Sequence, residues 1–139
     1  MFSDRQAIID VAIAYTWALD EKQFDQLNAV FAADATAELH GVRCEGRDAI
    51  IARIERPLSL LDATQHIVGN HQVDVDGDSA THRCYLQSQH VKRGTPGGDN
   101  YLIGGVYEDR LARTPDGWRI THRTMTAVWT DGNPAVIGH

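Results

Sequence analysis

The stretch 64-TQHIVGNHQVDV-75 decides the fold class, because here the spacing of apolar residues changes from a helical to a strand-like period. Three further strand-length runs follow: 80-ATHRCYLQSQHVKR-93, 100-NYLIGGVYEDRLAR-113 and 117-GWRITHRTMTAVW-129. Asp76-Gly77 and Thr114-Pro115-Asp116-Gly117 supply turns between these runs, and the glycine-rich segment 94–100 supplies a looser loop. A long antiparallel meander is therefore predicted from residue 64 onward.

The part of the chain before residue 64 has the three-and-four spacing of amphipathic helices. A first helix is predicted over 4–20, following a capping box that begins at Ser3. The further elements predicted in this half are a short helix over 24–31, a strand over 35–42 and a third helix that begins near Asp48 and is limited by Pro57. Helices followed by strands predict an α+β domain, with three N-terminal helices packed on one face of a curved sheet.

The length of 139 residues allows one domain to bury roughly 70% of the surface of the unfolded chain. No repeat, low-complexity segment or linker interrupts residues 1–139, so a single domain is expected. Residues 130–139 are typical of a C-terminal tail, and the sequence leaves open whether this tail is ordered.

The composition argues against several classes of partner. The formal net charge is -6 and the lysines and arginines form no run, so no nucleic acid is expected. No apolar stretch approaches the roughly 20 residues of a membrane span, and the charged N-terminus lacks the apolar segment of a signal peptide. Cys44 and Cys84 are expected to be buried, reduced cysteines of a cytoplasmic protein.

Common metal and cofactor motifs are missing from the sequence. The seven histidines show no His-x-His or His-Glu-x-x-His spacing. The segment 74-DVDGDS-79 begins like a calcium loop, but its glycine falls two positions early and Tyr85 stands where such a loop needs glutamate. No Walker, GxSxG or dinucleotide-binding glycine pattern occurs. The chemistry expected is acid–base catalysis, with no metal and no cofactor.

Asp20, His66 and His90 are candidates for such chemistry. Asp20 lies on or beside the apolar face of the first helix, where a carboxylate needs a hydrogen-bonding partner; the alternative is a solvated helix end. His66 lies on a strand whose two faces are both mixed, so it is either a structural histidine or, if a carboxylate reaches it, a base. His90 shares a strand face with Leu86 and Ser88.

Arg123, on the last strand, is a fourth polar candidate. As an alternative it would be a surface arginine opposite Glu108 or Asp109. Its position in the strand alternation is opposite to that of Trp118 and Ile120, so all three can share a face only if the strand contains a bulge.

The chain shares several features with one superfamily, namely the order of the elements, Asp20 at the end of the first helix, 46-GRDAI-50 and 116-DGWRI-120. By these features it resembles the nuclear transport factor 2-like, or SnoaL-like, superfamily over about residues 4–130. This resemblance implies a cone-shaped α+β barrel, in which a strongly curved, mainly antiparallel sheet and its helices enclose an apolar pocket. It also implies a homodimer or a homotrimer. The fold hosts both enzymes and binding modules, so it does not fix the function.

Within the superfamily the chain is most similar in motif to the hexachlorocyclohexane dehydrochlorinases and the scytalone dehydratases. The Asp–His dyad of both groups falls on Asp20 and His66, and the second catalytic histidine of the dehydratases falls on His90. The LIGG-x-Y segment of the dehydrochlorinases is matched by residues 102–107, and their catalytic arginine falls on Arg123. Residues that hold the substrate in each group differ here, so neither substrate is implied.

The function that this resemblance implies is a cofactor-independent, dehydratase-like lyase acting on a small hydrophobic cyclic compound. His66 would remove a proton from carbon as general base, with Asp20 orienting it. His90, if protonated, would donate to a departing hydroxyl, and Arg123 would stabilise negative charge. The residues expected to bind the substrate are Tyr15, Trp17, Val68, Leu86, Ser88, Ile103, Tyr107 and Met125.

Two alternatives to a lyase remain open at the level of sequence. An isomerase or a polyketide cyclase would use the same pocket. A non-catalytic ligand-binding or assembly module would share the fold, and it predicts that Asp20 and His66 are not in contact and that an obligate partner chain exists.

Overall fold

The structure, a computed structural model, describes residues 3–138. Its elements in chain order are α1 (Asp4–Asp20), the 3-10 helix η1 (Phe24–Ala29), β1 (Phe31–Leu39), β2 (Val42–Glu45), α2 (Arg47–Leu58), β3 (Ala63–Asp76), β4 (Ser79–Val91), β5 (Asn100–Thr114), β6 (Gly117–Gly132) and the 3-10 helix η2 (Pro134–Ile137). The six strands form one sheet in the order β2-β1-β6-β5-β4-β3. All pairs are antiparallel except β1 with β6, which is parallel.

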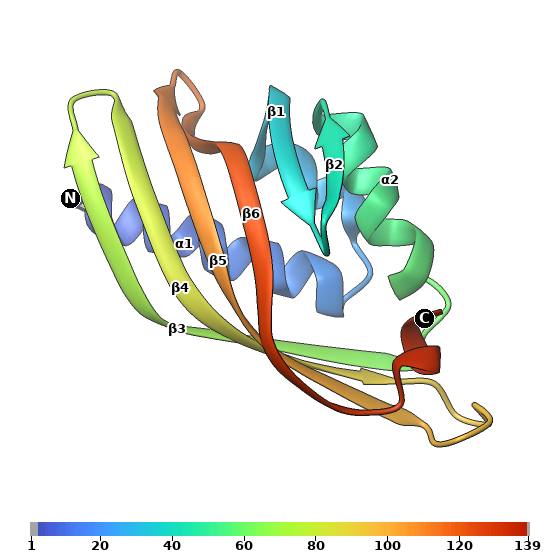
Figure 1. The fold of residues 1–139 in the computed structure, drawn as a ribbon. Helices are drawn as coiled ribbons and strands as arrows, with labels where there is room; N and C mark the ends of the chain where they lie inside the picture. The colour runs from blue at the N-terminus through green and yellow to red at the C-terminus, as the bar shows by residue number, and fades with distance from the viewer. Residues whose placement is uncertain (1–2, 139) are drawn as a thin grey trace.

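The α+β class and the curved sheet are as predicted from the sequence. Figure 1 shows the sheet bending strongly, with α1 lying across its concave face and α2 beside β1 and β2. The second predicted helix is a 3-10 helix, and β1 begins at Phe31, earlier than the sequence pattern indicates. The sheet does not close on itself, because β2 and β3 are its two ends. The fold is thus an open cone rather than a closed barrel.

Helix α1 begins where the sequence predicts it. The side chain of Ser3 caps its first turn, because Oγ accepts a hydrogen bond from the backbone N–H of Gln6 at 3.1 Å. The reciprocal half of a capping box is not formed, since the Gln6 amide donates to Asp10 instead. The chain leaves α1 through Lys22, whose positive φ of 54° turns it away from the helical path. This turn leaves Asp20 as the last helical residue.

Register shifts in two strand pairs, β3 with β4 and β5 with β6, accompany the bend of the sheet. The register of β3 against β4 shifts between Gly69 and Gln72, where Asn70 has a φ of 54°. The register of β5 against β6 shifts at Gly104/Gly105, where a Cβ on Gly105 would lie 2.5 Å from the backbone oxygen of Thr126. Glycine is required at position 105 because the two backbones approach this closely.

The described part of the C-terminal tail is ordered. Strand β6 continues to Gly132, and the Asn133 amide donates to the backbone oxygens of Pro96 and Gly98. Val136 in η2 is buried in the hydrophobic core. Residues 130–138 therefore pack on the domain, and His139 lies outside the described residues. Within residues 3–138, no helix has the length and apolar character needed to cross a membrane.

Candidate functional site

Asp20 and His66 are in direct contact, although they lie on different elements. Oδ1 of Asp20, at the end of α1, is 2.7 Å from Nδ1 of His66 in β3. Oδ2 of Asp20 accepts the backbone N–H of His66 at 2.8 Å, and Oδ1 also accepts the hydroxyl of Thr64 at 3.0 Å. Only 17% of the Asp20 side chain and 5% of the His66 side chain are exposed. Asp20 is therefore not a solvated helix end.

These contacts determine the protonation of Asp20 and the orientation of the imidazole. Burial raises the pKa of the Asp20 carboxyl, but the hydrogen bonds from His66 and Thr64 outweigh burial and hold the pKa below its ordinary value. An ionised carboxylate only accepts hydrogen bonds, so Nδ1 of His66 carries the proton that lies between them. The lone pair of neutral His66 is consequently on Nε2, the nitrogen not bonded to Asp20.

His90 presents a second nitrogen lone pair beside His66. Its Nδ1 is 3.0 Å from the backbone oxygen of Tyr101 and must donate to it, which leaves Nε2 as an acceptor. The rings of His66 and His90 meet edge to face, with centroids 5.8 Å apart. Burial lowers the pKa of His90 to about 4. Near neutral pH it is uncharged, so the expectation that a protonated His90 donates to a leaving group does not fit this environment.

Arg123 is fully buried rather than on the surface. Its Nε and one terminal nitrogen donate to the two oxygens of Asp109 at 2.7 and 2.8 Å. Its guanidinium lies over the rings of both Tyr15 and Tyr107, at 4.4 and 4.0 Å from their centroids. The bulge that the sequence requires is present, because Arg110 pairs with His122 whereas Leu111 pairs with Ile120.

The ion pair with Asp109 neutralises Arg123 and holds it away from the cavity in front of His66. The two charges neutralise each other within the core, and Arg123 is not among the residues that line the cavity in front of His66. Arg123 therefore does not reach this cavity, and its expected catalytic contact stays a prediction. The structure instead places this ion pair behind Tyr15 and Tyr107, which do line the cavity.

A cavity of about 70 Å³ lies in front of His66 and His90, between the sheet and α2. Six of the residues expected to bind substrate line it, namely Tyr15, Leu86, Ser88, Ile103, Tyr107 and Met125. Burial raises the pKa of the Tyr107 hydroxyl well above its ordinary value, so Tyr107 keeps its proton. On the side of the sheet, the cavity thus combines an apolar wall with the hydroxyl of Tyr107 and the imidazole of His90.

Two of the expected substrate-binding residues are elsewhere. Trp17 is 61% exposed, because it lies on the solvent side of α1 while Tyr15, Thr16 and Leu19 face the core. Val68 packs partly against the core, but its side chain does not line the cavity. Apolar spacing therefore does not identify which side chains line this cavity, and the substrate-binding roles of Trp17 and Val68 stay predictions.

The sequence interpretation missed the contribution of β1 and α2 to the cavity. The additional lining residues are Leu19, Leu39, His40, Arg53, Ile54, Pro57 and Leu58. The signal available in the sequence was the spacing of Arg53 and Pro57, which places them one turn apart on the third helix. Arg53 is the more informative of these, because it brings a half-buried cation to the cavity.

A larger depression of about 410 Å³ lies on the opposite face of the sheet. Outward-facing polar residues of four strands surround it, among them Arg83, Glu108 and Arg110. Charges of both signs line this depression, and the Asp20–His66 pair lies on the other side of the sheet. The smaller cavity is therefore the better candidate for an active site.

Comparison with known proteins agrees with this architecture. Residues 1–124 match the SnoaL-like domain. The terrestric acid biosynthesis cluster protein E of Penicillium crustosum is 34% identical over 142 residues, which cover 98% of this chain and 90% of that protein. The crystal structure of Kfla4162 from Kribbella flavida has a TM-score of 0.90 at 26% identity, covering 98% of this chain and 97% of that chain.

A hexachlorocyclohexane dehydrochlorinase is also similar in structure, with a TM-score of 0.81 over 93% of this chain and 88% of that chain. Its identity of 18% shows a common fold alone. The family fold includes dehydratases, isomerases and cyclases. Given the match over residues 1–124, the chain belongs to the SnoaL-like family.

Proposed function

We propose that the protein is a cofactor-independent lyase that removes a proton from carbon in a small hydrophobic cyclic compound and expels a hydroxyl or halide. The observation that carries this proposal is the 2.7 Å contact between Asp20 and His66, with the other imidazole nitrogen available to an apolar cavity. A base in such a position contributes roughly 10²- to 10⁴-fold to the rate.

In the proposed reaction Nε2 of His66 takes a proton from carbon, and the electrons of that C–H bond form a carbon–carbon double bond. The bond to the leaving group on the adjacent carbon breaks as the double bond forms. For an alcohol, the proton held on Nε2 returns to the departing hydroxide, so water leaves and His66 is neutral again. For a halide, the leaving group departs as the anion and the imidazolium proton passes to water. Asp20 stabilises the intermediate imidazolium because its carboxylate is ionised and 2.7 Å from Nδ1.

The neighbouring groups have complementary roles in this proposal. Nε2 of His90 accepts a hydrogen bond from a substrate hydroxyl, since neutral His90 cannot supply a proton from that nitrogen. The protonated hydroxyl of Tyr107 donates to a carbonyl or enolate oxygen. These contacts would orient the C–H bond toward His66.

Arg53 takes over the role expected of Arg123. It lines the cavity and forms no hydrogen bond or ion pair with any other residue of the described range 3–138. A guanidinium beside an apolar cavity favours a substrate that carries negative charge or develops it in the transition state. We therefore assign the stabilisation of an enolate or a departing halide to Arg53.

The small volume of the cavity requires part of its wall to move before a substrate can bind. Its volume of about 70 Å³ is well below the roughly 300–1,000 Å³ of ordinary ligand pockets. A ring-sized substrate enters only if part of the wall moves. The α2 segment that carries Arg53, Ile54, Pro57 and Leu58 is the proposed movable wall, because β4 and β5 are fixed by strand pairing without a register shift.

Hydrogen–deuterium exchange at carbon tests the proton abstraction without knowledge of the leaving group. A panel of cyclic ketones, enones, alcohols and halides is incubated with the protein in D₂O and followed by mass spectrometry. Wild-type protein is expected to exchange or eliminate at least one class, and His66→Gln is expected to lose at least 100-fold of that activity. Equal activity of wild type and His66→Gln on every compound would refute the proposal.

Product structure separates the lyase from the alternatives. Loss of water or halide identifies a lyase, a shifted double bond an isomerase, and ring closure a cyclase. The non-catalytic module predicts that Asp20 and His66 are apart, and their contact favours an enzyme. The cytoplasmic location stays a prediction.

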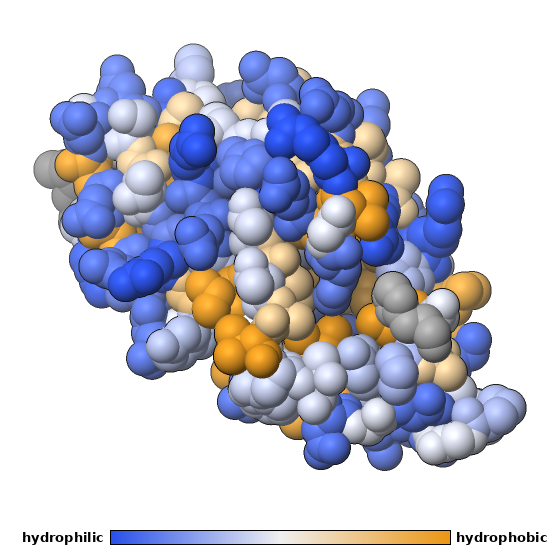
Figure 2. Space-filling view, viewed as in Figure 1, coloured by the Kyte–Doolittle hydropathy of each residue, from blue (hydrophilic) through white to orange (hydrophobic). Residues whose placement is uncertain are grey.

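We also propose that the protein forms a homodimer or a homotrimer. Figure 2 shows apolar side chains gathered over the bend of the sheet on a surface that is otherwise mostly hydrophilic. The exposed large hydrophobic residues of β6 are Val128 and Trp129. Light scattering of wild type and Val128→Asp measures the oligomeric state directly, and a monomeric wild type contradicts this assignment.

A further inference from the structure

The bulge in β3 brings His71 to the side chains of His82 and Cys84, which share one face of β4. Gly69 pairs with Tyr85 and Gln72 pairs with Arg83, so both Asn70 and His71 lie opposite Cys84. This extra residue turns His71 toward the inner face of the sheet. His82 and Cys84, two residues apart on β4, are both buried on that same face.

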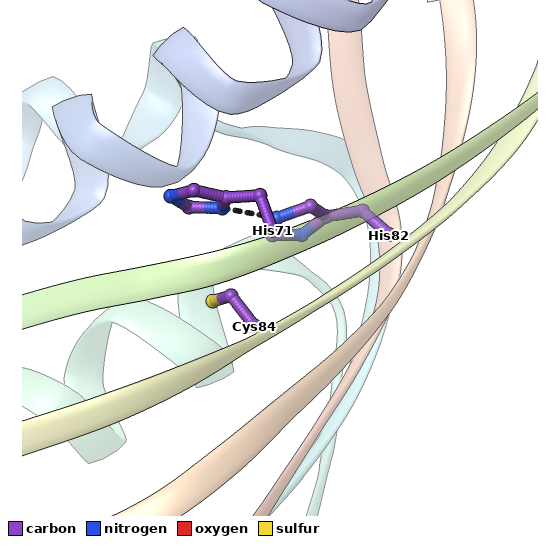
Figure 3. A group of neighbouring side chains, drawn as sticks. All are labelled: His71, His82 and Cys84. Carbon is purple, nitrogen blue, oxygen red and sulfur yellow. Dashed lines mark hydrogen bonds between the residues drawn. The ribbon is translucent and has the colours of Figure 1, made fainter.

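The donor atoms of these residues converge beneath α1. Nδ1 of His71 is 2.9 Å from Nε2 of His82, and the donor atoms of His71, His82 and Cys84 all lie within 4.8 Å of one another. Figure 3 shows the two linked imidazoles with the Cys84 side chain beside them, on the side of the strands that faces α1. Two imidazoles and one thiol form a ligand set suited to borderline-soft metal ions.

His82 is held in the orientation that a metal ligand needs. Its Nδ1 is 2.8 Å from Oδ2 of Asp109, whose two oxygens also accept from Arg123. The ionised carboxylate accepts the Nδ1 proton, so the lone pair on Nε2 of His82 is directed toward His71. A carboxylate that fixes the tautomer of a histidine is a common second layer around bound metal ions.

We propose that His71, His82 and Cys84 bind one divalent metal ion of the zinc type through Nδ1, Nε2 and Sγ respectively. Tetrahedral bonds of about 2.0–2.1 Å to nitrogen and about 2.3 Å to sulfur place the donor atoms about 3.3–3.6 Å apart. The two imidazoles then separate by a few tenths of an ångström from their hydrogen-bonded distance, and the sulfur approaches the nitrogens by about 1.2 Å at most.

The proposed metal site is distinct from the proposed active site. None of its three ligands lines the cavity in front of His66. His71 is the only ligand of the three that is not fully buried, so the fourth coordination position is open toward its side, where water completes the tetrahedron. The sequence missed this site because the bulge, rather than a regular spacing, supplies the first histidine.

Cobalt(II) titration of the chelator-treated protein tests the site. Wild type is expected to bind one equivalent of Co²⁺ with a thiolate-to-cobalt charge-transfer band, and Zn²⁺ is expected to displace it. Cys84→Ser is expected to lose that band, whereas the control Cys44→Ser, which changes the other buried cysteine, is expected to keep it.

A second variant keeps the test valid if Cys84→Ser does not fold. His71→Asn changes the least buried ligand and is expected to weaken Zn²⁺ binding by about 100-fold or more in a competition with a chromophoric chelator. Absence of the charge-transfer band in wild type, its survival in Cys84→Ser, or unchanged Zn²⁺ affinity in His71→Asn would each overturn the proposal.

Discussion

Replacing Asp20 with asparagine removes one negative charge from the proposed catalytic dyad while nearly preserving the shape of the side chain. The carboxylate is 2.7 Å from Nδ1 of His66, so the charge centres of a carboxylate and an imidazolium there are about 4 Å apart. At an effective dielectric constant of about 20, this pair interacts by roughly 4 kcal/mol. Partial exposure of Asp20, 17% of its side chain, lowers the figure to about 3 kcal/mol.

This attraction lowers the activation barrier, because the imidazolium forms only as proton abstraction proceeds and is absent from the ground state. A loss of about 3 kcal/mol from the transition state corresponds to a rate lower by roughly 150-fold. A larger loss is expected if the asparagine amide donates to Nδ1, because His66 then carries its proton on Nε2 and cannot act as a base. The expected range is therefore about 10²- to 10⁴-fold in kcat.

The assay is deuterium incorporation into the best compound of the panel, measured under saturating conditions. Thr64→Val is the matched control, because it removes one hydrogen bond to Asp20 but keeps the carboxylate charge. It is expected to cost about tenfold or less. If Asp20→Asn retains its rate within threefold of wild type while remaining folded, the dyad does not activate His66 and the reasoning fails.

Three further predictions follow from the same contacts. In ¹⁵N NMR spectra at neutral pH, neutral His66 is expected to show a protonated Nδ1 and an unprotonated Nε2; the reverse pattern would exclude the proposed base. Burial lowers the pKa of His90 to about 4 in the folded protein, whereas in the unfolded chain the ordinary value is about 6.5. As pH falls from about 6.5 toward 4, the unfolded chain therefore binds a proton at His90 that the folded protein does not, and the folded state loses stability. Wild type is expected to lose about 2 kcal/mol more than His90→Gln between pH 7 and 4.5 in urea unfolding, and equal losses would contradict this. Arg123→Met leaves Asp109 buried without its cation and is expected to cost about 3–5 kcal/mol of stability. Arg53→Gln is expected to change stability by less than about 0.5 kcal/mol but to lower activity. The opposite ranking would refute the assignment of a structural role to Arg123 and a catalytic role to Arg53.

The sequence predicted those parts of the fold that depend on regular periods. Helix α1 and the four long strands follow from apolar spacing and from turn residues, because burial of one face is the main force that selects them. Asp20 and His66 were identified as a pair through resemblance. Residue spacing alone left Asp20 at a solvated helix end as an open alternative.

The parts that the sequence did not predict depend on local departures from those periods. The bulges near Asn70 in β3 and near Thr121 in β6 each insert one residue and reverse which side chains face inward. Gly69 and Asn70 mark the bulge in β3 but do not fix which residue is inserted, whereas neither glycine nor proline marks the bulge near Thr121 in β6. The inward position of Arg123 and the approach of His71 to Cys84 both depend on these insertions.

The inner face of the sheet contains two histidine–aspartate pairs, and their surroundings assign them different roles. In both pairs the carboxylate holds Nδ1 of the histidine, so both present Nε2 as a lone pair. In front of His66 that nitrogen meets an apolar cavity, where a C–H bond can approach and where the imidazolium is stabilised by a partly exposed Asp20. In front of His82 the same nitrogen meets His71 and a thiol, and Asp109 is already neutralised by Arg123. A base needs a carboxylate whose charge is free to stabilise the imidazolium, whereas a metal ligand needs a neutral, fixed imidazole. The position of Arg123 therefore explains why His66, and not His82, is the candidate base.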